Sequence, residues 1–529
     1  MSSQFSMKSY MKGALLLTVA ALIVKVLSAV YRVPFQNLVG DQGFYVYQQV
    51  YPFISFFVVW TSGGVAVAIS KMLADTNEEG IKQGITKIIF QYLTVLSLLF
   101  FALLFFGAHM LSSWMGDPLL APLLKTGAFV TLCMPALAIM KGTFQSCAMM
   151  EPVAYAQVFE QAVRVSIILI GTIIVMTSLS QSVYAAGNMA MLGTVIGELA
   201  GVILLFVYMK KKRILFQGNI SIPKWPIIKE VTIFSITVSM SSLLLLAYQL
   251  VDSFTVFSML VDLGMPTLEA METKGIYDRG QPLVQLGIVI ASSFSLAIVP
   301  LVAHKSKKGT RDEVPYIQLT YRASLLFGLA ASLGLVLVMP YANTLLFKTD
   351  ALSPVLMLYV LQIIWLSIIL TFTSILQGYG KLKVPTYFLL GALTLKIAGN
   401  LLFIPLFGIL GVAVASNIGL CICALLLMYY LKKLKGIQLA TGNFYRKLFL
   451  ASMSMVVVVV LVAVLLNSVT DFSSVRMQAV VYSAVLILLG AFTFITVAAK
   501  LQILSVREWF IIPFGRKMAT YQLWLNKKK

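Results

Sequence analysis

Charge is scarce in this sequence. Of its 529 residues, 11% are charged and 60% are hydrophobic, whereas soluble globular proteins carry about 25% charged residues. Water cannot solvate a chain of this composition over most of its surface, so an arrangement of several soluble domains is excluded. The composition therefore predicts an integral membrane protein.

Residues and motifs typical of enzymes are also scarce. The sequence contains two histidines and no phosphate-binding loop, zinc-hydrolase motif or nucleophile elbow. Its four cysteines lie within or beside apolar runs and have no metal-ligand or disulfide spacing. They are Cys133, Cys147, Cys421 and Cys423. We therefore expect a protein that is not an enzyme and that holds no cofactor or metal. Any driving energy then comes from a coupling ion such as Na⁺ or H⁺, the membrane potential or a substrate gradient.

Apolar runs of helical length fill most of the chain. A helix needs about 20 apolar residues to cross the roughly 30 Å core of a bilayer, where it satisfies its own backbone polar groups. We expect an all-α polytopic membrane protein with about fourteen transmembrane helices. The expected spans are 11–33, 43–70, 87–111, 121–148, 153–177, 184–209, 231–260, 280–304, 319–346, 354–378, 385–404, 408–431, 447–467 and 476–499.

The net charge of +21 is spread over short clusters between these runs. No long basic stripe interleaved with aromatic residues is present, which excludes a nucleic-acid partner. The clusters follow the even-numbered spans, whereas the opposite loops are short or, in the longest, acidic. The clustered cations are Lys71, Lys82, Lys87, Lys141, Lys210, Lys211, Lys212, Arg213, Lys305, Lys307, Lys308, Arg311, Lys381, Lys383, Lys432, Lys433, Lys435, Arg446 and Lys447. Because cations concentrate on the cytoplasmic side, we expect a multi-pass membrane protein with both termini in the cytoplasm.

A long polar segment, 210–229, separates the first six spans from the rest. A weak repeat relates the two parts. In each part, a span follows a Lys-Gly or Gln-Gly pair and a proline, and that span carries a cation, Arg164 or Lys396, at nearly the same depth. We expect an N-terminal lobe at 1–220, a pseudo-symmetric C-terminal lobe at 221–445, and two additional spans with a basic cytoplasmic tail at 446–529. Paired halves around a central site are common in transporters.

Two of the cations in the first expected span are candidate site residues. Lys25 and Arg32 are seven residues apart, which places them two turns apart on one helical face. Charges inside a bilayer require a partner or a cavity, so the pair either lines a water-filled cavity or belongs to a buried structural ion pair. In a cavity, such a cationic face would match a pyrophosphate. A third cation, Arg279, lies at the mouth of the eighth span.

The other buried charges have two readings each. Glu160 and Arg164 have i,i+4 spacing and either neutralise each other or contact substrate. Glu198 lies in a glycine row that favours close helix packing, and it either pairs with a cation on a neighbouring helix or takes part in coupling. Asp252 either binds a coupling cation or neutralises Lys396.

Several segments carry a resemblance to a known family. They are Lys25 to Arg32 followed by 35–40, Tyr277-Asp278-Arg279 with Pro282 and 298–300, 142–145 with Pro152, and 396–400 with 404–408. Together they resemble the multidrug/oligosaccharidyl-lipid/polysaccharide exporter superfamily, and within it the branch of lipid II flippases and stage V sporulation protein B. Two features depart from that pattern: Lys25 is a point charge where an arginine would offer a fork, and the second span lacks the arginine that lipid II flippases often carry.

The resemblance implies a flippase that works by alternating access. It implies an undecaprenyl-diphosphate-linked cell-wall precursor, with lipid II as the first candidate, whose pyrophosphate contacts Lys25, Arg32 and Arg279. Asp252, Glu198, Glu160, Arg164, Lys396 and Asp278 are then coupling or charge-pair residues. Membrane lipids and cell-wall synthesis enzymes are the implied partners, and the bacterial cell membrane is the implied location.

Three alternatives remain open from the sequence. The first is a flippase for another lipid-linked glycan, such as a capsule, exopolysaccharide or spore-wall unit. The second is a cation-coupled multidrug exporter, which would use acidic residues for organic cations. The third is a membrane scaffold for wall-synthesis enzymes, which would not need cations at depth on one helical face.

Overall fold

The structure is a computed structural model of the chain. It describes residues 7–212, 222–289, 291–293, 298–299, 302, 313–469, 474–512 and 515–527. Part of the expected eighth span and several residues singled out in the sequence lie outside the described residues. These are Arg213, Pro300, His304, Lys305, Lys307, Lys308, Arg311, Lys528 and Lys529.

The regular elements of the described residues are helices. The first thirteen are α1 (Met7–Val30), α2 (Arg32–Val59), the π-helix η1 (Trp60–Val65), α3 (Ala66–Ala74), α4 (Glu79–Phe106), α5 (Ala108–Trp114), the 3₁₀ turn η2 (Pro118–Leu120), α6 (Ala121–Ser146), α7 (Met150–Ile173), the π-helix η3 (Ile174–Ser178), α8 (Val183–Lys211), α9 (Lys224–Asp262) and α10 (Thr267–Asp278). The others are α11 (Gly280–Gly287), α13 (Val314–Phe347), α14 (Ser353–Val360), α15 (Gln362–Gly378), α16 (Lys383–Phe407), α17 (Ile409–Lys435), α18 (Gly442–Val469), α19 (Val475–Lys500), α20 (Val506–Ile511) and α21 (Gly515–Asn526).

The predicted all-helical membrane fold is confirmed. Twelve helical stretches among the described residues are long and apolar enough to cross a membrane. The first of them, Val19–Ala74, runs through two of the spans expected from the sequence. The expected eighth span falls partly on residues outside the description. The count of about fourteen is therefore consistent with the structure.

Two compact units make up the chain. The first unit contains residues 1–278 and 396–412, and the second contains 279–395 and 413–529. Their boundary differs from the lobe boundary expected at residue 220, because α9 packs against α2 and η1 and α10 packs against α2 within the first unit. The division into two pseudo-symmetric lobes and an appended pair of spans stays a prediction.

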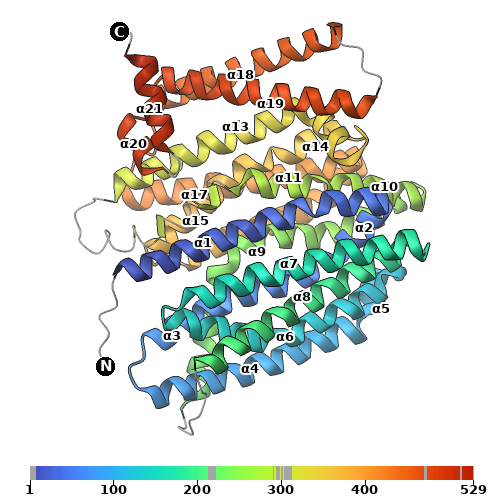
Figure 1. Cartoon of the computed structure of the whole chain (residues 1–529), viewed down its shortest axis with the longest axis vertical. Coiled ribbons are helices and arrows are strands. Elements are labelled where there is room, and N and C mark those ends of the chain that lie inside the picture. The colour runs from blue at the N-terminus through green and yellow to red at the C-terminus, as the bar shows by residue number, and fades with distance from the viewer. Residues whose placement is uncertain are drawn as a thin grey trace. The chain divides into compact units, whose positions relative to one another are not determined.

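Close helix packing shapes the first unit. α4 packs on α6, α6 packs on α8, and α8 packs on α7, so these four long helices form one group (Figure 1). The glycine row of α8 packs on α7, since a Cβ at Gly197 would lie 3.0 Å from the Glu160 carbonyl oxygen and one at Gly201 would lie 3.0 Å from Glu160 Oε2. Small residues let two helix backbones approach this closely. The glycines thus bring the charged side chains of α7 and α8 within reach of each other.

A break in α2 makes room for α10. Gly40 has φ 69° and ψ −173°, a backbone conformation that favours glycine. The Asp41 carbonyl that follows it lies against Gly275 of α10, where a Cβ would be 2.9 Å from the Asp41 carbonyl carbon. The sequence predicts a loop between the seventh and eighth spans, so α10 is an unexpected element.

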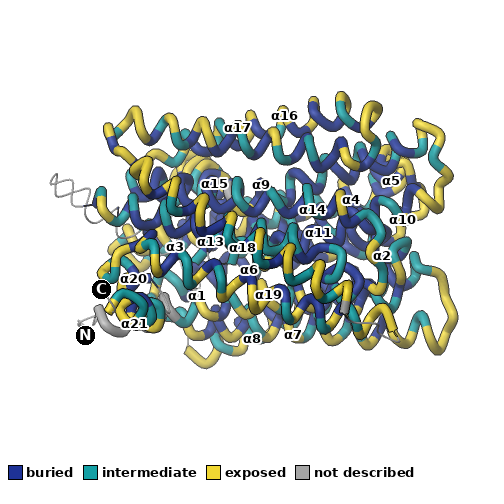
Figure 2. Tube along the Cα trace, turned by 90° about the horizontal axis from the view of Figure 1, so that it is seen from above, coloured by how far each residue is buried: buried dark blue, intermediate teal, exposed yellow. Residues whose placement is uncertain are grey.

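In the second unit, α18 and α19 pack against each other and against α13. α20 and α21 lie at the end of this group, near the C-terminus (Figure 1). Buried and exposed positions alternate along single helices (Figure 2). Many exposed positions are apolar, as with Val457, Leu461 and Val464 of α18, which are 50%, 59% and 63% exposed. An apolar outer surface of this kind suits contact with lipid.

Candidate functional site

Arg32 lies at the junction of the first two helices. α1 ends at Val30 and α2 begins at Arg32, whose side chain is wholly buried. Its guanidinium carbon lies 4.5 Å from the centroid of the Tyr51 ring, a cation–π geometry. Beside it, the hydroxyl groups of Tyr31 and Tyr47 are 2.6 Å apart. The first unit thus holds a buried cation against an aromatic wall.

Lys25 has a different environment from Arg32. It lies in the interior of α1 and its side chain is exposed, whereas Arg32 is buried. The spacing of seven residues therefore does not bring the two cations into one buried site within the first unit. Their expected roles in substrate binding stay predictions.

Arg279 is the buried cation of the second unit. It immediately precedes α11, is 0% exposed, and donates from Nη1 to Asn343 Oδ1 at 2.8 Å. The Phe347 ring centroid lies 5.1 Å from its guanidinium carbon. Asn343 in turn donates from Nδ2 to the Ala351 carbonyl at 3.0 Å and to Ser353 Oγ at 3.2 Å. Asn343 could not be predicted from the sequence, because a single amide in an apolar run carries no distinctive signal.

Four charged side chains form a polar cluster in the first unit. Lys141 of α6 lies 3.3 Å from Glu160 of α7, and Arg164 of α7 lies 2.6 Å from Glu198 of α8. Lys141 also donates to Ser62 Oγ at 2.9 Å. We call Lys141, Glu160, Arg164 and Glu198 the α6–α8 tetrad. It carries two positive and two negative charges, so its pairs neutralise each other across helices.

The tetrad corrects two interpretations of the sequence. Glu160 and Arg164, expected either to neutralise each other within one helix or to contact substrate, form ion pairs with Lys141 and Glu198 from neighbouring helices. A contact of either residue with substrate stays a prediction. Lys141, taken as a loop cation at the end of a span, is only 1% exposed. The residues around a lysine near the end of a helix do not show whether its side chain faces solvent or turns inward. Here the side chain turns inward, to a carboxylate about three turns along the next helix.

A second cluster joins α9 and α16 in the first unit. Lys396 lies 2.7 Å from Asp252, and Asn400 donates to the same carboxylate at 2.9 Å and to Thr255 Oγ1 at 2.8 Å. Lys396 also donates to the Val412 carbonyl at 3.3 Å. Of the two roles left open for Asp252, the structure has the one in which it neutralises Lys396.

Asp278 ends α10 and pairs within that helix. Lys274 Nζ donates to both carboxylate oxygens, at 2.6 and 2.7 Å, and Lys274 is 2% exposed. Burial raises the pKa of the Asp278 carboxyl, and Lys274 opposes that rise. Lys274 was not among the expected site residues, because it lies in a stretch without apolar periodicity.

These contacts define what the described site can do. Four buried cations, Lys141, Arg164, Lys274 and Lys396, each contact a carboxylate. The named contacts of Arg32 and Arg279 are to an aromatic ring and to an amide oxygen. In the part of the chain that the structure describes, no three His, Cys, Asp or Glu side chains gather as metal ligands would. Both arginines are buried with their guanidinium groups held in place, and a guanidinium suits recognition of an anion through its N–H donors.

A model of a family described as polysaccharide biosynthesis protein matches residues 10–306. The uncharacterized membrane protein YabM of Bacillus subtilis (strain 168) is 34% identical over 515 residues, covering 96% of each chain. Stage V sporulation protein B of the same organism is 29% identical over 354 residues, covering 64% of this chain and 66% of that protein. Its lipid II flippase MurJ is 23% identical over 437 residues, covering 77% of this chain and 80% of that protein.

Solved structures share the fold. The lipid II flippase MurJ in an inward closed conformation superposes with a TM-score of 0.71 at 15% identity, covering 92% of this chain and 99% of that one. A multidrug resistance MATE family transporter of the MOP superfamily, in an inward-facing conformation, gives 0.61 at 12% identity, covering 77% and 93%. At these identities the likeness concerns the fold, and it agrees with the resemblance inferred from the sequence segments.

Proposed function

Because the chain belongs to the polysaccharide biosynthesis protein family, in the branch of the exporter superfamily that resembles MurJ and stage V sporulation protein B, we propose that it is a flippase for an undecaprenyl-diphosphate-linked cell-wall precursor. Lipid II is the first candidate. The observation that carries the proposal is a wholly buried arginine in each unit, Arg32 and Arg279. No covalent chemistry is required of the protein.

The proposed mechanism is alternating access. The guanidinium groups of Arg32 and Arg279 would bind the pyrophosphate through paired N–H donors, an arrangement that lysine cannot reproduce. The aromatic ring beside Arg32 and the amide beside Arg279 hold each group in a defined orientation. Lys25, exposed on α1, would attract the same anion. The head group then crosses the membrane while the prenyl chain stays in lipid.

Complementation tests the substrate. A bacterial host is depleted of every lipid II flippase while this chain is expressed from an inducible promoter. We expect growth to be restored, with lipid II labelled at the outer surface. Failure of a well-expressed chain to restore growth would contradict lipid II as the substrate.

Single substitutions test the anion site. We expect Arg32→Ala, Arg279→Ala and Lys25→Ala each to abolish complementation, with normal amounts of protein in the membrane. Lys82→Ala is the matched control, because Lys82 pairs with Glu79 at the surface and should not matter for transport. Full activity of the double variant Lys25→Ala/Arg32→Ala would refute the anion site.

A flippase for another lipid-linked glycan is the second candidate. The family description, polysaccharide biosynthesis protein, favours it. A host lacking its capsule, exopolysaccharide or spore-wall flippase then provides the test. A multidrug exporter is less well supported, because Glu198 and Asp252, the acids that it would use, contact Arg164 and Lys396. Unchanged drug resistance on overexpression would count against it.

A further inference from the structure

Two short helices follow the last expected span. α19 ends at Lys500, and α20 begins at Val506 after a capping box in which the Ser505 side chain and the Glu508 side chain bond each other's backbone N–H groups. α21 follows at Gly515. Because a span ends at the level of the lipid head groups, α20, which begins six residues after Lys500, lies close to that level, and α21 packs against it. We call α20 and α21 the C-terminal pair.

The inner face of the C-terminal pair is fixed to the second unit. Arg322 of α13 forms an ion pair with Glu508. Trp509 donates from Nε1 to Gln522 Oε1 at 2.7 Å, and Gln522 donates from Nε2 to the Leu504 carbonyl at 3.2 Å. These contacts set which side of each helix faces outward.

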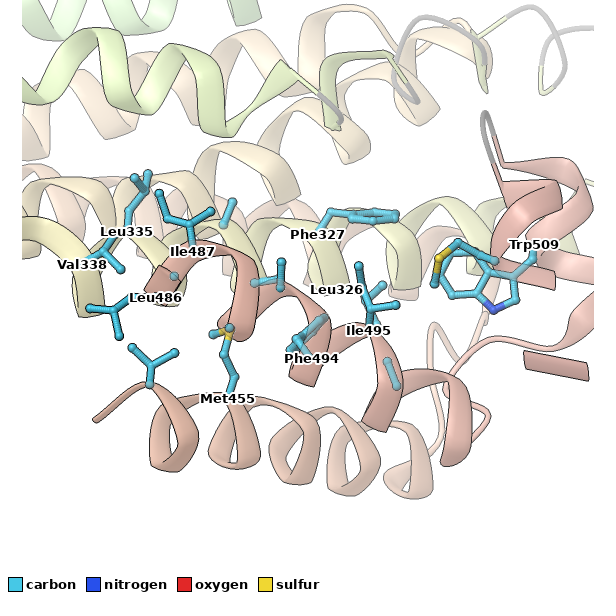
Figure 3. A pocket seen from close by; sticks show the side chains of 18 residues that line it. Leu326, Phe327, Leu335, Val338, Met455, Leu486, Ile487, Phe494, Ile495 and Trp509 are labelled. Carbon is cyan, nitrogen blue, oxygen red and sulfur yellow. The ribbon is translucent and has the colours of Figure 1, made fainter. Parts of the chain in front are cut away.

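An apolar cavity between α13, α18 and α19 reaches the C-terminal pair. It has a volume of about 370 Å³ and is lined by apolar side chains of α13, α18 and α19, with Trp509 at one end (Figure 3). Met518 of α21 also lines it. Trp509 of α20 and Ala519 of α21 are nevertheless buried in the core of the second unit. Packing therefore accounts for the inner face of the pair and leaves its outer face to be explained.

The outer face combines cations with large apolar side chains. Its exposed cations are Arg507, Arg516, Lys517 and Lys527. Its exposed apolar side chains are Phe510, Ile511, Leu523 and Trp524, and Trp524, stacked on Tyr521 with ring centroids 6.0 Å apart, is 66% exposed. The acid of α20, Glu508, is already occupied by Arg322. Tryptophan and cations on one side of a short helix are typical of the membrane interface.

We propose that the outer face of the C-terminal pair binds the anionic head groups of phospholipids in the adjacent leaflet. The cations contact the phosphates, and Phe510, Leu523 and Trp524 enter the upper acyl region. Lipid binding then stabilises the contacts of the pair with α13 and α19, so the pair opens less often. This function is separate from transport and does not depend on the identity of the flipped substrate.

Hydrogen exchange on the full-length protein tests the proposal. The protein is placed in nanodiscs of phosphatidylcholine alone or of phosphatidylcholine with phosphatidylglycerol, and amide exchange is followed over 506–526. We expect exchange there to be about fivefold slower in the anionic nanodiscs, the factor that corresponds to the attraction of one cation to an anionic surface. Exchange in α18 should be the same in both.

Two variants separate local binding from general charge. In Arg507→Gln/Arg516→Gln/Lys517→Gln the lipid dependence over 506–526 should disappear. In Lys210→Gln/Lys211→Gln/Lys212→Gln, which removes three exposed or terminal cations from α8, it should persist. Equal exchange of the unmodified protein in both lipids would overturn the proposal and assign this face to solvent or to a protein partner. Loss of the effect in both variants would also overturn it.

Discussion

Asn343 holds a buried cation without carrying a charge. Its amide oxygen accepts from Arg279 while its amide nitrogen bonds the Ala351 carbonyl and Ser353. The side chain therefore couples the orientation of Arg279 to the turn between α13 and α14. Left-handed conformations at Lys348 and Leu352, with φ of 68° and 53°, make that turn dependent on such support.

We predict that Asn343→Leu destabilises the protein by about 1–3 kcal/mol, because it leaves buried donors and acceptors without their partner. Transport should fall further than stability explains, since Arg279 loses its orientation. Asn343→Asp keeps the acceptor oxygen and provides the comparison. Thermal unfolding in detergent gives the first quantity and complementation the second. Equal activity of the two variants at equal expression would show that Asn343 does not position Arg279.

The Lys141–Glu160 pair gives a second prediction at this scale. Removing one partner of a buried ion pair leaves an uncompensated charge, and it typically destabilises a protein by about 3–5 kcal/mol. Lys141→Met should therefore unfold at a much lower temperature. Lys141→Met/Glu160→Gln removes both charges and should recover most of the loss. A double variant as unstable as the single one would mean that the lysine acts through packing alone.

Individual charges could be found in the sequence, but their partners could not. Arg164, Glu198, Asp252 and Lys396 stand out because charges are rare in apolar runs. Their pairing depends on which helices become neighbours and how these rotate, and both are set by nonlocal packing. The buried positions of Lys141 and Lys274 could not be predicted either. Lys141 lies at the end of an expected span and Lys274 in a polar stretch, and lysines at such positions are ordinarily exposed.

The π-helix η1 lies where the sequence predicts part of an ordinary α-helical span. Its wider turn exposes Gly64 to α9, and a Cβ there would lie 2.5 Å from the Ser235 carbonyl oxygen and closer still to Ser239 Oγ. Trp60 donates to Ser235 Oγ at 3.2 Å from the same turn. π-helical turns are rare in proteins, and those that do occur are often found at functional sites. η1 also supplies Ser62 to the tetrad.

Gly64→Ala and Gly63→Ala form a matched pair for testing this packing. We predict that Gly64→Ala lowers the unfolding temperature and transport, since a backbone oxygen cannot move aside easily. At Gly63 the nearest atom, Ser239 Oγ, would be 3.9 Å from the new Cβ. Gly63→Ala should therefore be neutral or slightly stabilising, because alanine favours helix over glycine by about 1 kcal/mol. The same loss in both variants would contradict the close approach of α9.

Short polar helices were the elements hardest to predict. α10 and α21 have too few apolar residues for a span and no clear helical period. Their helices form because one face packs on a neighbour, as Gly275 does on α2 and Ala519 in the second unit. Long spans need no such information, because the bilayer alone forces an apolar segment of that length to be helical.

At the scale of the whole molecule, the orientation in the membrane is testable. Leu268 on α10 is 63% exposed and should face outward, whereas Lys381, between α15 and α16, should face the cytoplasm. In a background with the exposed Cys147 replaced by serine, Leu268→Cys should react with a membrane-impermeant maleimide in intact protoplasts. Lys381→Cys should react only after permeabilisation. The reverse pattern would place both termini outside.

The α6–α8 tetrad also has a consequence for biogenesis. The tetrad is spread over three successive helices, with Lys141 on α6, Glu160 and Arg164 on α7, and Glu198 on α8. Each helix would therefore enter the lipid carrying a charge whose partner emerges from the ribosome earlier or later. A charge at the centre of a lone helix opposes insertion by about 2.5–3.5 kcal/mol, and α7 carries two. These helices must then leave the translocon together, and they can do so only after α8, the last of the three, has been synthesised.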